Sequence, residues 1–266
     1  MRASYAGYKS RLMRSFHSPT VPMLTSSRME ERATRESLID SLAEAVAEVK
    51  PRLRGWLHLA SAPLTLAAGI VLIVLSPTAS TRVGSAVYCA SAVLLFTVSA
   101  VYHRGHWSPR VHAMLRRFDH ANIFLLIAGS YTPFSLLLLH GTQRTVLLTV
   151  VWSAAILGVL FRVFWLDAPR WLHTPIYIIV GSTAVFFLPA LTQGARGELG
   201  GGLGTAVLAL VVAGGALYTA GGVVYGFRRP NPWPRWFGFH EVFHTFTILA
   251  FVTHYVGVSL ATYSLR

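Results

Sequence analysis

Charged residues are scarce in this 266-residue sequence: Asp, Glu, Lys and Arg make up 12% of the chain, against roughly 25% in ordinary soluble domains. Acidic residues are the scarcest, with 10 Asp and Glu against 23 Lys and Arg. Apolar residues fill 53% of the chain instead. This composition excludes an ordinary soluble domain, and we interpret the chain as an integral membrane protein.

Cysteine is nearly absent, since Cys89 is the only one and falls inside an apolar run. A lone cysteine has no intramolecular partner, so no disulfide framework is expected. We expect Cys89 to serve packing.

Long apolar runs are what the sequence has in abundance. Crossing about 30 Å of hydrocarbon takes about 20 helical residues, and seven runs reach that length. They are Trp56–Leu75, Val83–Tyr102, Asp119–Leu139, Thr145–Phe164, Leu172–Leu191, Leu203–Phe227 and His240–Leu260. The sequence therefore predicts an all-α membrane protein, a seven-transmembrane-helix bundle with its termini on opposite sides of the membrane.

Lys and Arg are distributed unevenly between the two sets of connecting segments. The segments on the N-terminal side of the membrane, with Arg162 at the edge of one, hold 19 of the 23 Lys and Arg, and the opposite set holds four. Because cytoplasmic loops retain positive charge, we predict a multi-pass protein of the cell membrane with a cytoplasmic N-terminus and an external C-terminus. Topology and attraction to anionic lipid head groups then account for the formal charge of +13, so no nucleic-acid partner is expected.

Residues 1–49 contain no spanning run. Residues 1–27 are basic, rich in Ser and free of acid, which is typical of a disordered arm; an organellar presequence and a later start codon are alternatives. Apolar positions recur at helical spacing over residues 30–49, which predicts an amphipathic interfacial helix. Residues 50–266 hold all seven runs with short connections, which indicates one membrane domain.

Three predicted spans carry polar residues at ends that share one leaflet. The second span ends with Ser99 and His103, the third begins with Asp119, and the seventh begins with His240 and His244. Each pair separated by four residues lies on one face of its helix. Ionisable groups at this depth are expensive and are functional candidates by default.

Three imidazoles at one depth can hold a metal ion. His103, His240 and His244 with a water in the fourth position would form the open tetrahedral site of a catalytic zinc. Iron, nickel and copper are compatible with the same ligands, and zinc is the predicted ion. Each part has an ordinary alternative, because a His pair can be merely hydrogen-bonded and Asp119 can cap a helix.

The seventh span also matches the H-E-x-x-H motif of metalloproteases, in which the Glu is the general base. After His244 the chain offers no carboxylate and only His254 as a further histidine, about 15 Å along a helix. Glu241 also points roughly 100° away from the His face. An intramembrane protease is therefore disfavoured.

The remaining histidines are expected to serve structural roles. His120 follows Asp119 but is turned away from it by one residue. The others in the membrane domain, apart from His254, fall at interfacial or loop positions where solvent or carbonyl partners are available: His58, His106, His112, His140 and His173.

The sixth span is rich in glycine. Gly222 and Gly226 have the small-residue spacing that lets helices approach closely. We expect them to pack within the bundle rather than at a dimer interface.

Four stretches carry a family resemblance: KPRLRGWLH from Lys50, Ser99-xxx-His103, FDHANIFLLIAGSYTPF from Phe118, and the His-xxx-His of the last span. Together they resemble the hemolysin III family, the bacterial branch of the progestin and adipoQ receptors, over residues 50–260. The resemblance implies seven helices around a zinc ion near the cytoplasmic face. It assigns His103, His240 and His244 as ligands, Asp119 as the group that holds the water on the zinc, and Ser99 as a supporting group.

The resemblance also implies a chemistry. The receptor branch and the related alkaline ceramidases are associated with ceramide amide hydrolysis, whereas the bacterial branch is named for hemolysis. The expected mechanism is zinc-assisted hydrolysis of a lipid amide or ester that enters from the bilayer, with Asp119 taking the proton of the water and Ser99 orienting the site. The alternatives are a non-catalytic sensor or receptor and a pore-forming cytolysin. The chain departs from the family pattern in Glu241 and in its N-terminal extension.

Overall fold

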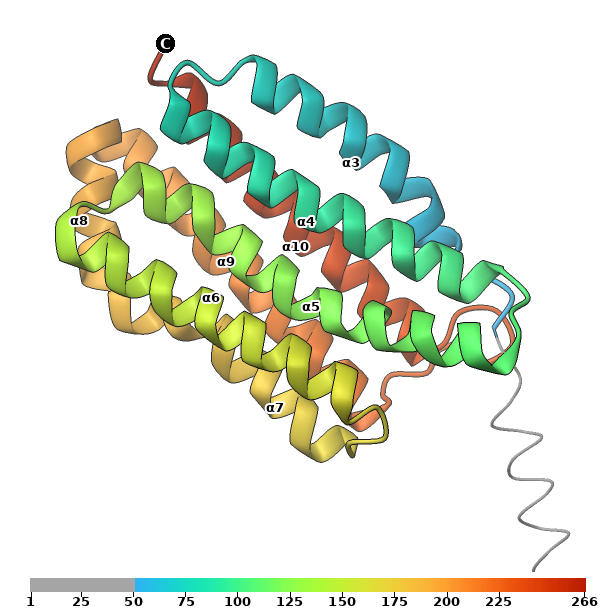
Figure 1. The fold of residues 1–266 in the computed structure, drawn as a ribbon. Coiled ribbons are helices and arrows are strands. Elements are labelled where there is room, and N and C mark those ends of the chain that lie inside the picture. The colour runs from blue at the N-terminus through green and yellow to red at the C-terminus, as the bar shows by residue number, and fades with distance from the viewer. Residues whose placement is uncertain (1–50) are drawn as a thin grey trace, which may run out of the picture. The chain divides into compact units, whose positions relative to one another are not determined.

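The computed structural model describes residues 51–266 and contains helices but no strand in that range (Figure 1). The predicted basic arm and amphipathic helix over residues 1–49 lie outside the described residues. The elements are α3 (Trp56–Val74), α4 (Ala79–Arg104), α5 (Pro109–Leu138), α6 (Gly141–Phe164), α7 (Arg170–Gly181), η1 (Thr183–Phe187), α8 (Leu188–Leu199), α9 (Gly201–Phe227) and α10 (Phe239–Tyr263). Seven spans in the described part are long and apolar enough to cross a membrane, with α7 to α8 counting as one. The predicted seven-helix membrane fold is confirmed.

The third spanning helix begins at Pro109 rather than at Asp119. Pro109 occupies the first turn after Ser108, where the N–H that proline lacks would be unpaired in any case. The prediction missed this extension because residues 109–118 are rich in basic side chains. The length of an apolar run follows the thickness of the membrane, whereas the helix itself can continue beyond it. Asp119 therefore lies inside α5 and is not its N-terminal cap.

The fifth spanning segment is broken in its middle. α7 ends at Gly181, the 3-10 turn η1 follows, and α8 continues to Leu199, so most of the loop expected over residues 192–202 is helical. Tyr131 of α5 bridges the break. Its hydroxyl donates to the carbonyl of Gly181 at 2.6 Å and accepts from the N–H of Ala184 at 2.8 Å. Backbone groups freed inside a bilayer need such partners.

Helix α10 packs against α9, α3, α5 and α4 (Figure 1). α4 lies against both α3 and α5, α6 against α5, and α7 and α8 against α9. Aromatic side chains fill the centre, where the hydroxyl of Tyr88 donates to the carbonyl of Phe251 at 2.6 Å. Large apolar side chains such as Leu64 and Phe186 remain exposed, as expected for a surface that faces lipid.

The glycines of α9 serve close packing within the bundle, as predicted. A Cβ at Gly222 would lie 3.2 Å from Ile178, and one at Gly226 would lie 3.3 Å from Thr174, both on α7. A Cβ at Gly214 would lie 2.2 Å from the ring of His254 on α10. These glycines therefore let α7 and α10 approach the backbone of α9.

The polar residues singled out in the sequence gather at one end of the bundle. α4 and α6 finish at this end and α3, α5 and α10 begin there, whereas the C-terminus lies at the other end (Figure 1). Which side of the membrane this end faces stays a prediction from the distribution of Lys and Arg.

Candidate metal centre

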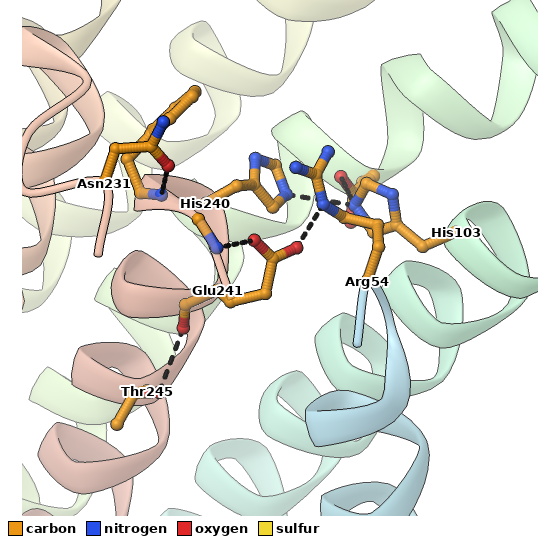
Figure 2. A network of polar contacts seen from close by, with 9 residues as sticks. Arg54, His103, Asn231, His240, Glu241 and Thr245 are labelled. Carbon is orange, nitrogen blue, oxygen red and sulfur yellow. Dashed lines mark hydrogen bonds and ion pairs between the residues drawn. The ribbon is translucent and has the colours of Figure 1, made fainter. Parts of the chain in front are cut away.

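Three imidazoles meet at this end of the bundle. One ligand atom from each of His103, His240 and His244 lies within 4.8 Å of the other two. The Nε2 atoms of His103 and His240 are 3.1 Å apart (Figure 2), and the ring centroids of His240 and His244 are 4.4 Å apart. Among the described residues no other set of three or more His, Cys, Asp or Glu converges in this way.

Two helices supply these side chains. His103 lies in the last turn of α4, one turn after Ser99. His240 and His244 lie in the first two turns of α10, and their spacing of four places them on one face. The spacing within each helix and the packing of α4 near α10 thus bring together ligands that are far apart in the sequence.

The donor set fits a tetrahedral metal ion. Two imidazole nitrogens bound to one zinc, each about 2.0–2.1 Å from it, are about 3.3 Å apart, close to the 3.1 Å between the Nε2 atoms of His103 and His240. Two facing lone pairs repel each other unless a proton or a cation lies between them. His103 and His244 are only 6% and 3% exposed, so solvent competes little for these nitrogens. Neutral imidazole is a preferred ligand of zinc.

Asp119 and Ser99 complete the cluster. The Oδ2 of Asp119 is 3.7 Å from the Nε2 of His103, and the Asp119 side chain is 11% exposed. Ser99 lies one turn before His103 on α4, and its buried hydroxyl has no hydrogen-bond partner among the described residues. The structure therefore brings all the predicted site residues together.

Glu241 is engaged away from the histidines. One carboxylate oxygen accepts the backbone N–H of Gly238 at 2.8 Å, and the other pairs with Arg54 (Figure 2). The first contact caps α10, in the manner of a Glu at the third helical position. Because both oxygens are committed, Glu241 is poorly placed to act as the base of an H-E-x-x-H protease.

The segment that precedes α3 also belongs to the site. The N–H groups of residues 52–53 donate to the carbonyls of residues 235–236 at 3.0 and 3.2 Å, and Arg54 then reaches α10. Gly55 has a φ of 81°, and a Cβ there would lie 2.7 Å from the Cβ of His103. Only glycine satisfies both conditions.

His58 is a site residue that the sequence interpretation missed. The predicted interfacial position with solvent partners is wrong, because His58 is 2% exposed. Its ring stacks on that of His244, with centroids 3.8 Å apart and an interplanar angle of 9°. Neither ring nitrogen has a hydrogen-bond partner among the described residues. A signal was available, because the motif that starts at Lys50 ends on His58.

The other histidines divide by exposure. His173 was also predicted at an interface and is buried. His120 has the expected structural contacts, to the carbonyl of Arg116 at 2.8 Å and to the hydroxyl of Tyr225 at 3.2 Å. Exposed as predicted are His106, His112 and His140.

An apolar cavity of about 120 Å³ extends from the histidines into the bundle. Asp119 and His244 line one part of it, and Phe134, Leu191 and His254 line another. Because His244 and His254 are ten residues apart on α10, the lining extends about 15 Å along that helix. A cavity with polar groups at one end and apolar walls suits an amphipathic molecule.

Comparison with known proteins agrees with the motifs. Residues 46–255 match the family model described as Haemolysin-III related. The chain is 32% identical to Hemolysin-3 of Bacillus cereus over 194 residues, which cover 72% of this chain and 82% of that protein. It is 30% identical to the Hemolysin-3 homolog of Bacillus subtilis (strain 168) over 162 residues, 61% of this chain and 69% of that protein. It is 27% identical to the Adiponectin receptor protein of Drosophila melanogaster over 162 residues, 57% of this chain and 36% of that protein.

Proposed function

Because the chain belongs to the Haemolysin-III related family and is a multi-pass protein of the cell membrane, we propose that it binds zinc through His103, His240 and His244 and hydrolyses a lipid amide or ester. The observation that carries this proposal is the meeting of three imidazoles and Asp119 beside an apolar cavity.

The chemistry follows from the groups present. A zinc ion bound here would activate a water molecule and polarise a carbonyl oxygen. Asp119 would accept the proton of that water, because its carboxylate lies beside His103. Ser99 orients the carboxylate from the neighbouring helix. His58 holds the ring of His244 in place by stacking.

The cavity supports a lipid as the substrate. Its walls are largely apolar, whereas Ser99, Asp119 and the two ligand histidines of α10, His240 and His244, lie together at one end. An acyl chain would occupy the apolar part, which places an amide or ester bond near the polar groups. A ceramide-like amide has this arrangement of groups.

A non-catalytic sensor or receptor is the second candidate, because the same cavity can bind a lipid without turnover. The name of the Drosophila relative, an adiponectin receptor protein, favours this candidate. The names of the two Bacillus relatives favour a cytolysin. The protease is the weakest candidate, because Arg54 and Gly238 occupy the carboxylate of Glu241.

Elemental analysis of the detergent-purified protein tests the metal. We expect about one zinc per chain, and we expect the double variant His240→Ala, His244→Ala to lose it. His140→Ala is the matched control, since His140 is exposed and lies at the opposite end of the bundle. Unchanged zinc content in the double variant would overturn the site.

Turnover separates the candidates. Lipid extracts are incubated in nanodiscs with the zinc-loaded wild type or Asp119→Asn, and the lipids are compared by mass spectrometry. A hydrolase consumes an amide or ester and releases a fatty acid only with the wild type. A wild type that leaves every lipid unchanged refutes the hydrolase; leakage of dye-filled vesicles then identifies a cytolysin, and intact vesicles favour the sensor.

A further inference from the structure

Arg162, near the end of α6, is buried and has no counter-ion among the described residues. It is 1% exposed and is the largest fully buried side chain among the described residues. Its Nε and Nη1 atoms have no hydrogen-bond partner in that part of the chain. An unpaired buried charge is expensive, most of all in a membrane. A bound anion would remove this cost.

The acidic residues of the described part do not supply that anion. Residues 51–266 contain four carboxylates, and each interacts with another side chain. The pairs are Asp119 with His103, Asp167 with Arg116, Glu198 with His140, and Glu241 with Arg54.

The groups near Arg162 are instead imidazoles and phenols. Its charge acts on His120, His173, Tyr177 and Tyr225. The hydroxyl of Tyr177 donates to the carbonyl of His120 at 3.2 Å, and the rings of His120 and His173 are 6.3 Å apart. These groups come from α5, α7 and α9, and none of them supplies a negative charge to the guanidinium.

The first turns of α7 add further unpartnered donors. The Nη1 of Arg170, the Nδ1 of His173 and the Oγ1 of Thr174 are buried and have no hydrogen-bond partner among the described residues. The guanidinium of Arg170 lies 5.1 Å from the centre of the Tyr225 ring, and the His173 ring lies 6.1 Å from the same ring. Every one of these atoms can donate a hydrogen bond.

We propose that Arg162, Arg170, His173 and Thr174 form a binding site for a phosphate group. Phosphate oxygens accept several hydrogen bonds at once, and guanidinium groups bind them with two parallel donors. The start of α7 contributes the positive end of the helix dipole. The phosphate belongs either to free inorganic phosphate or to the head group of an anionic phospholipid.

The connection from α6 to α7 carries exposed aromatic side chains. Phe164, Trp165 and Trp171 are 82%, 52% and 76% exposed. Exposed Trp is typical of the membrane interface. The phosphate site therefore lies near the depth of lipid head groups, within reach of both sources.

The full chain in zwitterionic nanodiscs tests the site by thermal unfolding with two probes. One is inorganic phosphate, and the other is phosphatidic acid incorporated in the disc in place of phosphatidylcholine with the same acyl chains. We expect at least one probe to raise the Tm of the wild type saturably. In Arg162→Gln, the probe concentration that gives half of the Tm increase should be about tenfold higher or more. Arg110→Gln, which removes an exposed arginine at the same end of the bundle, is the matched control and should respond like the wild type.

The two probes separate the sources. A response to inorganic phosphate identifies a soluble ligand, and a response to phosphatidic acid alone identifies a lipid. No response of the wild type to either probe overturns the site, as does an equal response of Arg162→Gln and the wild type. Arg170→Gln removes a half-buried arginine and gives the same test with little disturbance of the core.

A second measurement uses the sign of the stability change. Without any anion, Arg162→Gln should melt no lower than the wild type, because an unpaired buried charge is removed. With the anion, the order should reverse; an Arg162→Gln protein that melts lower by the same amount under both conditions contradicts the proposal. Zinc content should stay at the wild-type value in both variants, so the phosphate site and the metal site can fail independently.

Discussion

Two polar clusters lie at the same end of the bundle and differ in the kind of atom that they offer to a ligand. The histidine cluster, His103, His240 and His244, offers nitrogen atoms that can act as ligands. The arginine cluster, which consists of Arg162, Arg170, His173 and Thr174, offers unpartnered atoms that can donate. The first suits a cation and the second an anion. The burial of polar side chains identifies both clusters as candidate sites. Whether their unpartnered atoms accept or donate then indicates the charge of the ligand.

Tyr225 stands between the two clusters. Its hydroxyl contacts the Nε2 of His120 at 3.2 Å, its ring lies 6.0 Å from that of His240, and the guanidinium of Arg170 lies 5.1 Å from its centre. The neutral phenol separates the positively charged cluster from the proposed cation. Substitutions confined to one cluster should therefore leave the ligand of the other in place.

The largest expected effect is a difference in thiol labelling between two cysteine variants, which tests the side of the membrane that both clusters face. Each variant should be either labelled or unlabelled in intact cells. His106→Cys and His140→Cys place thiols at exposed positions at the clusters' end and at the opposite end of the bundle. Cys89 is 3% exposed, so it should give little background. In intact cells, a membrane-impermeant maleimide should label His140→Cys and should label His106→Cys only after permeabilisation. The reverse pattern would place both clusters outside and contradict the topology predicted from Lys and Arg.

Asp119→Asn should produce the largest change in chemistry. The amide cannot accept the proton of the attacking water, so turnover of a lipid amide or ester should fall about 10²–10⁴-fold. Zinc content should be unchanged. Asp167→Asn is the matched control, because this carboxylate is 85% exposed and pairs with Arg116 near the arginine cluster; it should leave turnover intact. Equal losses in both variants would remove the special role of Asp119.

Glu241→Gln should lower stability and leave the chemistry intact. Glutamine can still cap α10, but Arg54 loses its partner, which we expect to cost about 2 kcal/mol because Arg54 is partly solvated. Unfolding in detergent measures the loss, and Arg54→Gln combined with Glu241→Gln tests the coupling. Turnover per folded, zinc-loaded molecule should be unchanged. Its disappearance in Glu241→Gln at normal zinc content would favour the H-E-x-x-H interpretation.

Much of the fold could be predicted from the sequence because a bilayer imposes simple rules. Apolar length gave the seven spans, and spacings of four placed Ser99 with His103 and His240 with His244. The shared depth of these pairs with Asp119 predicted the histidine cluster. The start of α5 and the break after Gly181 were missed, since neither a basic first turn nor a bridging tyrosine changes the apolar length of a span.

The sequence did not reveal the burial of His58 or the arginine cluster. α3 is apolar around much of its surface, so periodicity did not show that His58 faces α10. Arg162 was counted as a topology signal at the edge of a span, where an arginine can extend to water. Only the structure shows that its guanidinium is enclosed and that no carboxylate in residues 51–266 pairs with it.

Substitutions of His58 should produce the smallest effect, a change in zinc affinity. They test whether a zinc ion in the histidine cluster would keep a free fourth coordination position. His58→Ala should weaken zinc binding about tenfold, because His244 loses the ring that orients it. His58→Phe preserves a stacking ring, so its zinc affinity should stay within about twofold of the wild type, measured by competition with a chelator. If His58→Phe loses zinc as severely as His58→Ala, a nitrogen of His58 contributes to binding. Four imidazoles would then close the coordination sphere in the manner of a structural zinc, and the sensor would become the better account of the protein.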